Sequence, residues 1–115
     1  MSVAACLQSL PKTLKIGAYD WSVTLMDDAD AFCGQADFAV HRLRLWPANL
    51  NSPSHVVSVT LHECFHVVFD VQGLGDLKRG KEDREEQIVL GFETGVVSLF
   101  RDNPKLLTWT KRWLR

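Results

Sequence analysis

The chain has 115 residues, 46% of them hydrophobic, a length and composition typical of one domain with a single core. Its 13 lysines and arginines nearly balance its 14 aspartates and glutamates, which argues against nucleic acid or an anionic membrane as the main partner. Three cysteines without CxxC spacing (Cys6, Cys33 and Cys64) indicate reduced thiols, and no apolar run suits a signal peptide or a membrane span. We therefore expect a cytoplasmic protein with one domain over residues 1–115, and the oligomeric state stays open.

Three short segments in the first half of the chain have the pattern of β-strands. Residues 14–16 and 21–25 are rich in strand-forming residues and are separated by a glycine-containing turn, which predicts a hairpin. The three aspartates within residues 27–30 predict an exposed loop. In residues 39–46, inward and outward side chains alternate until Pro47, which predicts a third strand with one buried face.

A long helix is predicted after these strands. Ser52 has the character of an N-cap residue, and Pro53 suits the first helical position. The apolar run over residues 56–71 then continues until Gly73 and Gly75 can end the helix.

A second long helix follows a charged loop over residues 78–83. Its apolar side chains recur with helical spacing until Asn103 and Pro104 break the pattern, and residues 105–115 suit a short basic helix with two tryptophans. We therefore predict an α+β fold, a minimal domain in which a small, mostly antiparallel sheet packs beside two antiparallel helices.

The first helix carries an HExxH motif, formed by His62, Glu63 and His66. Histidines four residues apart project from one helix face, so both imidazoles can reach one Zn²⁺, while Glu63 can act on a water molecule as a general base. If the motif occurred by chance on a buried helix, its polar side chains would be buried without partners, at a cost of several kcal/mol. A bound metal ion would compensate for this cost. The longer metzincin motif is absent, because Phe69 and Gln72 occupy its glycine and histidine positions.

A third ligand must therefore come from elsewhere in the chain. Glu85, Glu86 and Glu93 all fall on or beside the apolar side of the second helix. Glu86 ranks first, because its separation of twenty residues from His66 is similar to that in thermolysin-like zincins. Asp70 is a weaker candidate that could instead accept a hydrogen bond from a ligand imidazole.

Further segments form a pattern that spans most of the chain. They are Leu10-Pro11-Lys12, Gly34 in the loop before the third strand, Thr60-Leu61 before the motif, Glu85-Glu86-Gln87-Ile88-Val89, and Arg101-Asp102-Asn103-Pro104. With this pattern the sequence resembles small zinc metallopeptidases of phages and prophages, which are distantly similar to the ImmA/IrrE-type zincins. The resemblance implies a minimal zincin-like fold with a glutamate ligand from the second helix.

Other residues suit structural roles better than functional ones. Cys64 lies on the far side of the helix from the two histidines and suits a core thiol. His55 suits a partly exposed position in the first helical turn, although it could contact substrate. His41 could approach the site, but a core-facing position on the third strand is the preferred interpretation.

These observations predict a zinc metallopeptidase that hydrolyses peptide bonds in a peptide or protein substrate, with Glu63 as general base and His62, His66 and Glu86 as ligands. The third strand, residues 39–46, could pair with an extended substrate. The alternative is a non-catalytic, zinc-stabilised protein-interaction module of phage origin, although such a module does not need Glu63. A nucleic-acid-binding role would depend on the basic C-terminal stretch, which is better explained as an amphipathic helix whose tryptophans cover the core.

Overall fold

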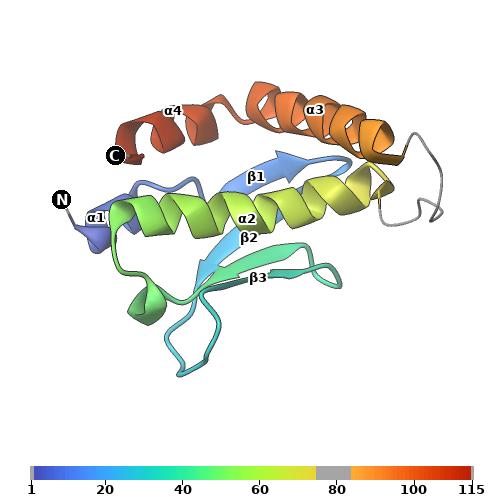
Figure 1. The fold of residues 1–115 in the computed structure, drawn as a ribbon. Coiled ribbons are helices and arrows are strands. Elements are labelled where there is room, and N and C mark those ends of the chain that lie inside the picture. Colours follow the sequence, from blue (N-terminus) through green and yellow to red (C-terminus); the bar gives the residue numbers. More distant parts are fainter. Residues whose placement is uncertain (1, 75–83, 115) are drawn as a thin grey trace.

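The computed structural model of the protein describes residues 2–74 and 84–114. One four-stranded sheet, in the order β1-β2-β4-β3, packs with helices that precede and follow it in the sequence (Figure 1). The elements are α1 (Val3–Gln8), β1 (Thr13–Ile16), β2 (Tyr19–Leu25), β3 (Gly34–Asp37), β4 (Arg42–Leu45), the 3-10 turn η1 (Pro47–Asn49), α2 (Pro53–Val71), α3 (Arg84–Asp102) and α4 (Pro104–Trp113).

The hairpin predicted at the start of the sheet is confirmed. β1 and β2 pair antiparallel, with Ile16 opposite Tyr19. Gly17 in the turn has a φ of 65°, a left-handed value that glycine adopts without strain, and a Cβ there would lie 2.9 Å from Cγ2 of Val71. Glycine therefore permits both the tight turn and the close approach of the end of α2.

The sheet as a whole is mixed, whereas we predicted a mostly antiparallel one. β4 pairs parallel with β2 and antiparallel with β3. The parallel pairing arises because residues 26–33 carry the chain past the position of β4 before β3 begins, so that β4 returns between β2 and β3. β4 is consequently paired on both sides, and β3 is an edge strand.

The third predicted strand, residues 39–46, is shorter in the structure and begins at Arg42. Asp37 ends β3 by accepting a hydrogen bond through Oδ1 from the backbone N–H of Ala39 (3.1 Å), and His41 takes a φ of 53°. This turn chemistry prevails over the alternating pattern at residues 39–41. β3 itself contains glycine, glutamine, alanine and aspartate, which are weak strand formers, so the sequence predicted a loop there.

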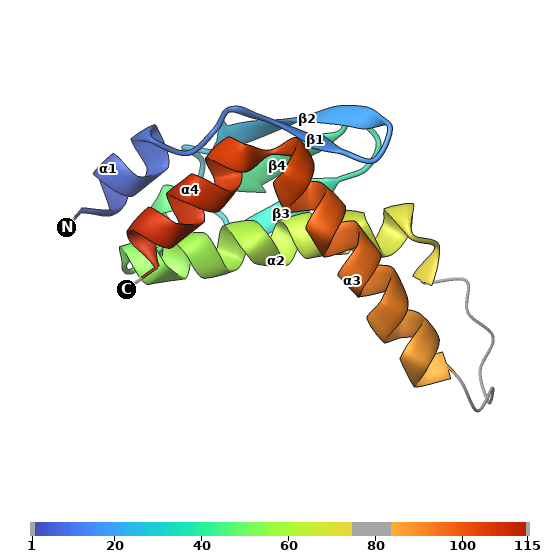
Figure 2. The ribbon, with the colours of Figure 1, turned by 90° about the horizontal axis from the view of Figure 1, so that it is seen from above.

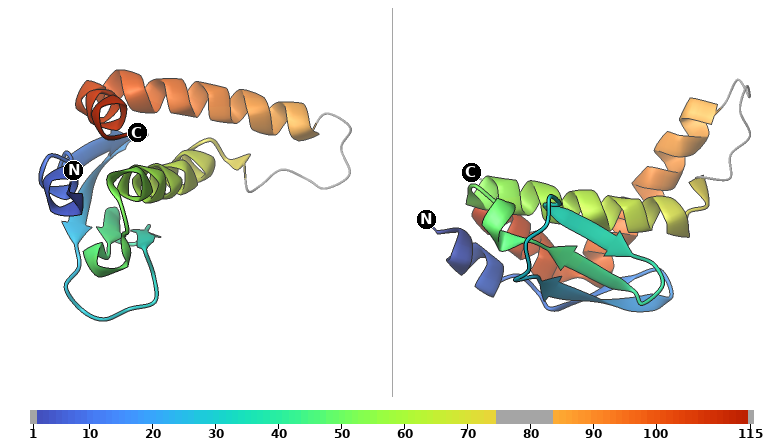
Figure 3. Two further views of the ribbon diagram at one scale, coloured as in Figure 1. Left: turned by 60° about the vertical axis from the view of Figure 1, so that its left-hand side comes forward. Right: turned by 90° about the horizontal axis from the view of Figure 1, so that it is seen from below.

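One face of the sheet is buried and the other is open. α2 lies along the buried face, and the view from below in Figure 3 shows the strands in front of the helices. Along β1, β2 and β4, alternate side chains point to the helices and are buried. They are Leu14, Ile16, Trp21, Val23, Leu43 and Leu45.

Both long helices predicted from the sequence are confirmed, as α2 and α3. Ser52 caps α2 by accepting a hydrogen bond through Oγ from the N–H of His55 (3.1 Å), and Gly73 follows the helix end with a φ of 67°. Gly75 and the charged loop predicted over residues 78–83 lie outside the described residues. α3 runs in the opposite direction to α2 and crosses it obliquely (Figures 1 and 2).

Asn103, at the corner between α3 and α4, joins these helices to the sheet. Its Oδ1 accepts a hydrogen bond from the N–H of Lys15 (2.8 Å), and its Nδ2 donates to the carbonyls of Lys15 (2.7 Å) and Leu99 (2.8 Å). The side-chain amide thus pairs with the backbone of edge strand β1. The sequence predicted Asn103 as a helix breaker, and its second role fixes the position of the helical corner.

α4 is the closing helix that the C-terminal pattern predicted. Trp109 and Trp113 are buried, and their indole N–H groups donate to the carbonyl of Cys6 and to Oγ of Ser9, both at 2.9 Å. The cations of α4 that the structure describes are exposed. Cys6 lies in α1 and Ser9 directly follows this helix, which was not predicted. Among the described residues, the pair of long helices is therefore preceded by α1 and followed by α4. None of the helices over residues 2–74 and 84–114 is long and apolar enough to cross a bilayer.

Candidate metal centre

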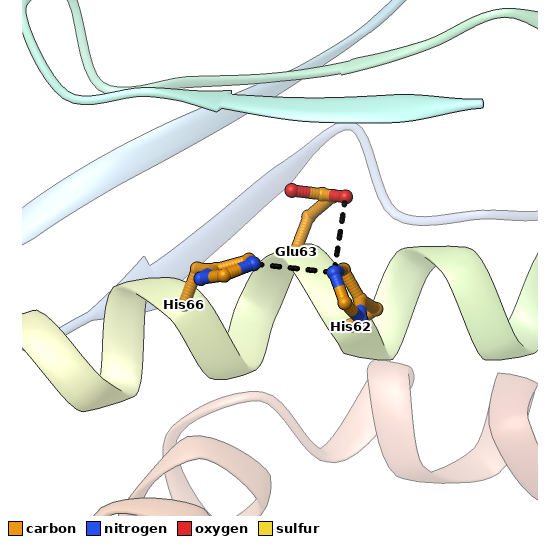
Figure 4. Close-up of side chains that lie close together, drawn as sticks. All are labelled: His62, Glu63 and His66. Carbon is orange, nitrogen blue, oxygen red and sulfur yellow. Dashed lines mark hydrogen bonds and ion pairs between the residues drawn. The ribbon is translucent and has the colours of Figure 1, made fainter. Parts of the chain in front are cut away.

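The central turns of α2 present the HExxH motif at the rim of the buried sheet face. His62 and His66 are exposed, whereas Glu63, about 100° around the helix from His62, is buried. Val67 and Cys64 pack into the core and set the rotation of the helix. Figure 4 shows the resulting arrangement, in which the two imidazoles approach each other and the carboxylate points toward the sheet.

The two imidazoles converge on one point. Nε2 of His62 lies 3.1 Å from Nε2 of His66, and the planes of the two rings are inclined at 80° to each other. Two nitrogens at this separation, each about 2.0–2.1 Å from one zinc ion, would subtend an angle of about 100° at the ion, close to the tetrahedral value. With Glu63, the histidines form a group whose ligand atoms all lie within 4.8 Å of one another. This group could hold a metal ion.

Glu63 is the buried member of the group and lies beneath the edge strand. Its side chain is 9% exposed, and its Oε2 lies 4.0 Å from Nε2 of His62, a separation that one water molecule can bridge. A Cβ on Gly34 of β3 would lie 3.1 Å from Cγ and 3.2 Å from Oε2 of Glu63. The glycine therefore leaves room for the carboxylate, a role that the sequence, which placed Gly34 in a loop, did not indicate.

Two cavities meet at the histidine pair. One, of about 330 Å³, lies beside β3 and is lined in part by Gly34, Phe38 and Glu63. The other, of about 340 Å³, lies on the α3 side. His62 and His66 line both, and each volume falls within the range of about 300–1,000 Å³ typical of ligand pockets.

The strand that borders the first cavity differs from the one we expected. Residues 42–45 of the predicted third strand are internal in the sheet, so their backbone is already paired on both sides. β3 is the edge strand beside the histidines. The free backbone edge on this side of the sheet therefore belongs to β3, and the expected pairing of residues 39–46 with an extended peptide has no free edge on β4.

The structure does not bring the third predicted ligand, Glu86, to the histidines. Glu86 is exposed in the first turn of α3 and lies outside the metal-binding group found among the described residues. α3 approaches the site through Phe92, whose ring centroid lies 5.9 Å from that of Phe69. Glu85 precedes Phe92 by two turns and shares its side of the helix, whereas Glu86 and Glu93 are turned from it by about 100–120°. Glu85 and Glu93 are also exposed and lie outside that group, so ligation by Glu86, or by either of these alternatives, stays a prediction.

Two other side chains of α2 were assigned from the sequence. Cys64 is a core thiol, as predicted, and burial raises its pKa to about 12, with a further contribution from the charge of Glu63. Asp70 is exposed and lies outside the group formed by His62, Glu63 and His66 among the described residues.

The remaining histidines have structural positions. His55 is partly exposed in the first turn of α2, as predicted, and its Nδ1 accepts a hydrogen bond from the N–H of Asn51 (3.1 Å). The expected position of His41 on the third strand is wrong, because His41 lies in the β3–β4 turn. Its half-buried ring stacks on Tyr19, with centroids 4.0 Å apart, and packs edge-on against the buried Trp21, with centroids 5.3 Å apart.

No protein-family model, curated protein or solved structure matches this chain. The function is therefore inferred from the residues of the site and their geometry.

Proposed function

We propose that this protein is a zinc-dependent peptidase in which His62 and His66 hold the ion and Glu63 is the general base. The observation that carries the proposal is the approach of the two Nε2 atoms to 3.1 Å beside a buried carboxylate, 4.0 Å from one of them. A pair of exposed imidazoles leaves coordination positions for a further ligand and for water, as a catalytic zinc site needs. Peptide as the substrate class is supported by the resemblance of the motif to that of zincins.

The mechanism assigns the proton transfers to Glu63. A bound zinc ion would supply a Lewis acid that lowers the pKa of a water molecule and polarises the scissile carbonyl. Glu63 would take a proton from that water as the water oxygen bonds to the carbonyl carbon, and would return it to the amide nitrogen as the C–N bond breaks. One peptide bond and one water thus give one carboxylic acid and one amine.

The position of Glu63 suits this role. Packing beneath Gly34 restricts the carboxylate to the side of the histidines that faces β3. A peptide that adds to the open edge of β3 would run past the same side, because β3 and the histidines border one cavity. A carboxylate from α3 would complete a set of three protein ligands.

The test compares the wild type with Glu63→Gln on a broad peptide library, at zinc contents matched by elemental analysis. Glutamine keeps the shape of the side chain but not its basicity, so zinc binding should persist while hydrolysis falls by about 10²–10⁴-fold. Asp20→Asn removes an exposed carboxylate of β2 and should leave hydrolysis unchanged. Hydrolysis by Glu63→Gln at the wild-type rate would remove Glu63 from the mechanism, and full zinc occupancy in His66→Ala would refute the metal site.

A further inference from the structure

The cavity on the α3 side of the histidine pair has aromatic walls. This aromatic cavity is lined by His62, Phe65, His66, Phe69 and Phe92. The ring of Phe92 is edge-on to that of Phe65, with centroids 6.3 Å apart and planes at 84°, and lies 5.9 Å from that of Phe69. Apart from the two imidazoles, the described side chains that line it are apolar.

The backbone of α3 sets the width of the aromatic cavity. Gly91 faces Leu74, and a Cβ on Gly91 would lie 2.6 Å from Cδ2 of that leucine. Gly95, one turn on, is packed in the same way against Val68. Because both contacts depend on the absence of a side chain, α3 approaches α2 closely enough for Phe92 to face the two phenylalanines of α2. The cavity is thus a feature of helix packing.

We infer that the aromatic cavity binds a large apolar side chain, phenylalanine or leucine, of the substrate residue next to the scissile bond. This inference rests on the proposed peptidase function. His62 and His66 border both the aromatic cavity and the cavity beside β3, so a peptide that runs along β3 and crosses the histidines brings its next side chain to the aromatic cavity.

The chemistry of the walls selects an apolar occupant. An aromatic side chain buries about 150–250 Å² and can take the offset or edge-to-face geometry that phenylalanine rings favour. A charged side chain would lose its hydration, and the apolar rings of Phe65, Phe69 and Phe92 offer no hydrogen bond in return.

Matched peptides test this assignment. Two pairs of blocked hexapeptides carry phenylalanine or alanine on one side or the other of the scissile bond and are otherwise identical. In at least one pair, zinc-loaded wild type should cleave the phenylalanine peptide with a kcat/KM at least about tenfold higher. Phe92→Trp fills the aromatic cavity and should bring this ratio toward one, whereas Leu90→Ala, on the exposed outer side of α3, should preserve it.

Equal kcat/KM values within both pairs, or a ratio unchanged by Phe92→Trp, would overturn the inference. Circular dichroism establishes whether the variant is folded. If Phe92→Trp does not fold, Phe69→Trp fills the cavity from α2 and carries the same expectation.

A binding measurement distinguishes a failure of this inference from a failure of the proposed function, because it does not require hydrolysis. Zinc-loaded Glu63→Gln is titrated with the same peptides by isothermal titration calorimetry, and the Kd of the preferred phenylalanine peptide should be at least about tenfold lower. Phenylalanine-selective binding without hydrolysis by the wild type would refute the peptidase and support the cavity. Hydrolysis without selectivity in either measurement would retain the peptidase and refute the cavity.

Discussion

Cys33 and Cys64 are free thiols that differ in their access to solvent. Cys33 directly precedes Gly34 of β3, and Cys64 lies within the HExxH motif. Cys64 is fully buried in α2, and burial raises its pKa to about 12, which keeps it as the unreactive thiol. Cys33 is half-buried just before β3, with Sγ 3.7 Å from the carbonyl of Asn49. Cys6, the third thiol, is also buried beneath α4.

We expect a thiol reagent such as dithionitrobenzoate to modify one cysteine in the native protein at pH 8, and that cysteine should be Cys33. Cys6 and Cys64 should react after unfolding in guanidinium, because their sulfurs are shielded and a thiol reacts as the thiolate. Absorbance at 412 nm counts the thiols, and Cys33→Ser should abolish the native reaction. Rapid native modification of two thiols would contradict the burial of Cys6 or Cys64.

Residues whose role depends on local spacing could be predicted from the sequence, whereas those defined by distant neighbours could not. His62 and His66 share a helix face because they are four residues apart, so their convergence follows from helix geometry alone. Gly34 acts through Glu63, and Asn103 acts through Lys15 of β1, 88 residues away. No periodicity in the sequence records either contact.

The packing of β3 against α2 allows a direct test at the level of these two elements. Gly34→Ala should lower the free energy of unfolding by about 1–3 kcal/mol, because the new Cβ would lie 2.8 Å from Cγ1 of Val59 and 3.1 Å from Cγ of Glu63. Val59→Ala removes the closest of these atoms. In urea unfolding, the double variant should therefore be more stable than the sum of the single effects predicts, by at least about 0.5 kcal/mol. Strict additivity would show that β3 moves away from α2 without strain.

The long apolar patterns of α2 and α3 predicted these helices correctly. The strand prediction failed where local hydrogen bonds close a turn. The first three residues of the segment 39–46 alternate like a strand, but the hydrogen bond from Ala39 to Asp37 closes a turn there. Which side of α3 faces α2 is a tertiary property as well. It depends on the contact of Phe92 with Phe69, which the helical pattern of α3 does not contain.

The third ligand can be identified by replacing Glu85, Glu86 and Glu93 singly by glutamine. The separation from His66 predicts the greatest loss of zinc affinity at Glu86. Glu85, which lies on the same side of α3 as Phe92, and Glu93 are the alternatives that these variants test. Competition with a chromogenic chelator measures the affinity, and loss of a ligand should weaken it by at least about tenfold, since even outer contacts typically contribute that much. Equal affinities in all three variants would exclude a glutamate ligand from α3.

At the scale of the whole molecule, the core is closed without contributions from the two histidines. The indoles of Trp109 and Trp113 donate hydrogen bonds to α1 and to Ser9, the residue that caps it, and Asn103 bonds to β1. The C-terminal helices thus hold the N-terminal elements in place. The buried side chains come from all of these elements and from α2. His62 and His66 lie outside this core, and the side chain of His62 is 67% exposed.

Removal of the metal should therefore weaken the fold without abolishing it. A ligand that binds only the native state at a free concentration one hundred times its Kd stabilises that state by about 2.7 kcal/mol, and such a contribution raises Tm by several degrees. We expect EDTA to lower the Tm of the zinc-loaded protein by such an amount, while the far-ultraviolet circular dichroism at 25 °C and the cooperativity of unfolding persist. The doubly substituted His62→Ala, His66→Ala protein should show the same Tm with and without EDTA. Loss of the helical signal at 25 °C on chelation would contradict a core that is independent of the metal, because a protein folded by its zinc unfolds when the ion is removed. That outcome would favour the zinc-stabilised interaction module over the peptidase.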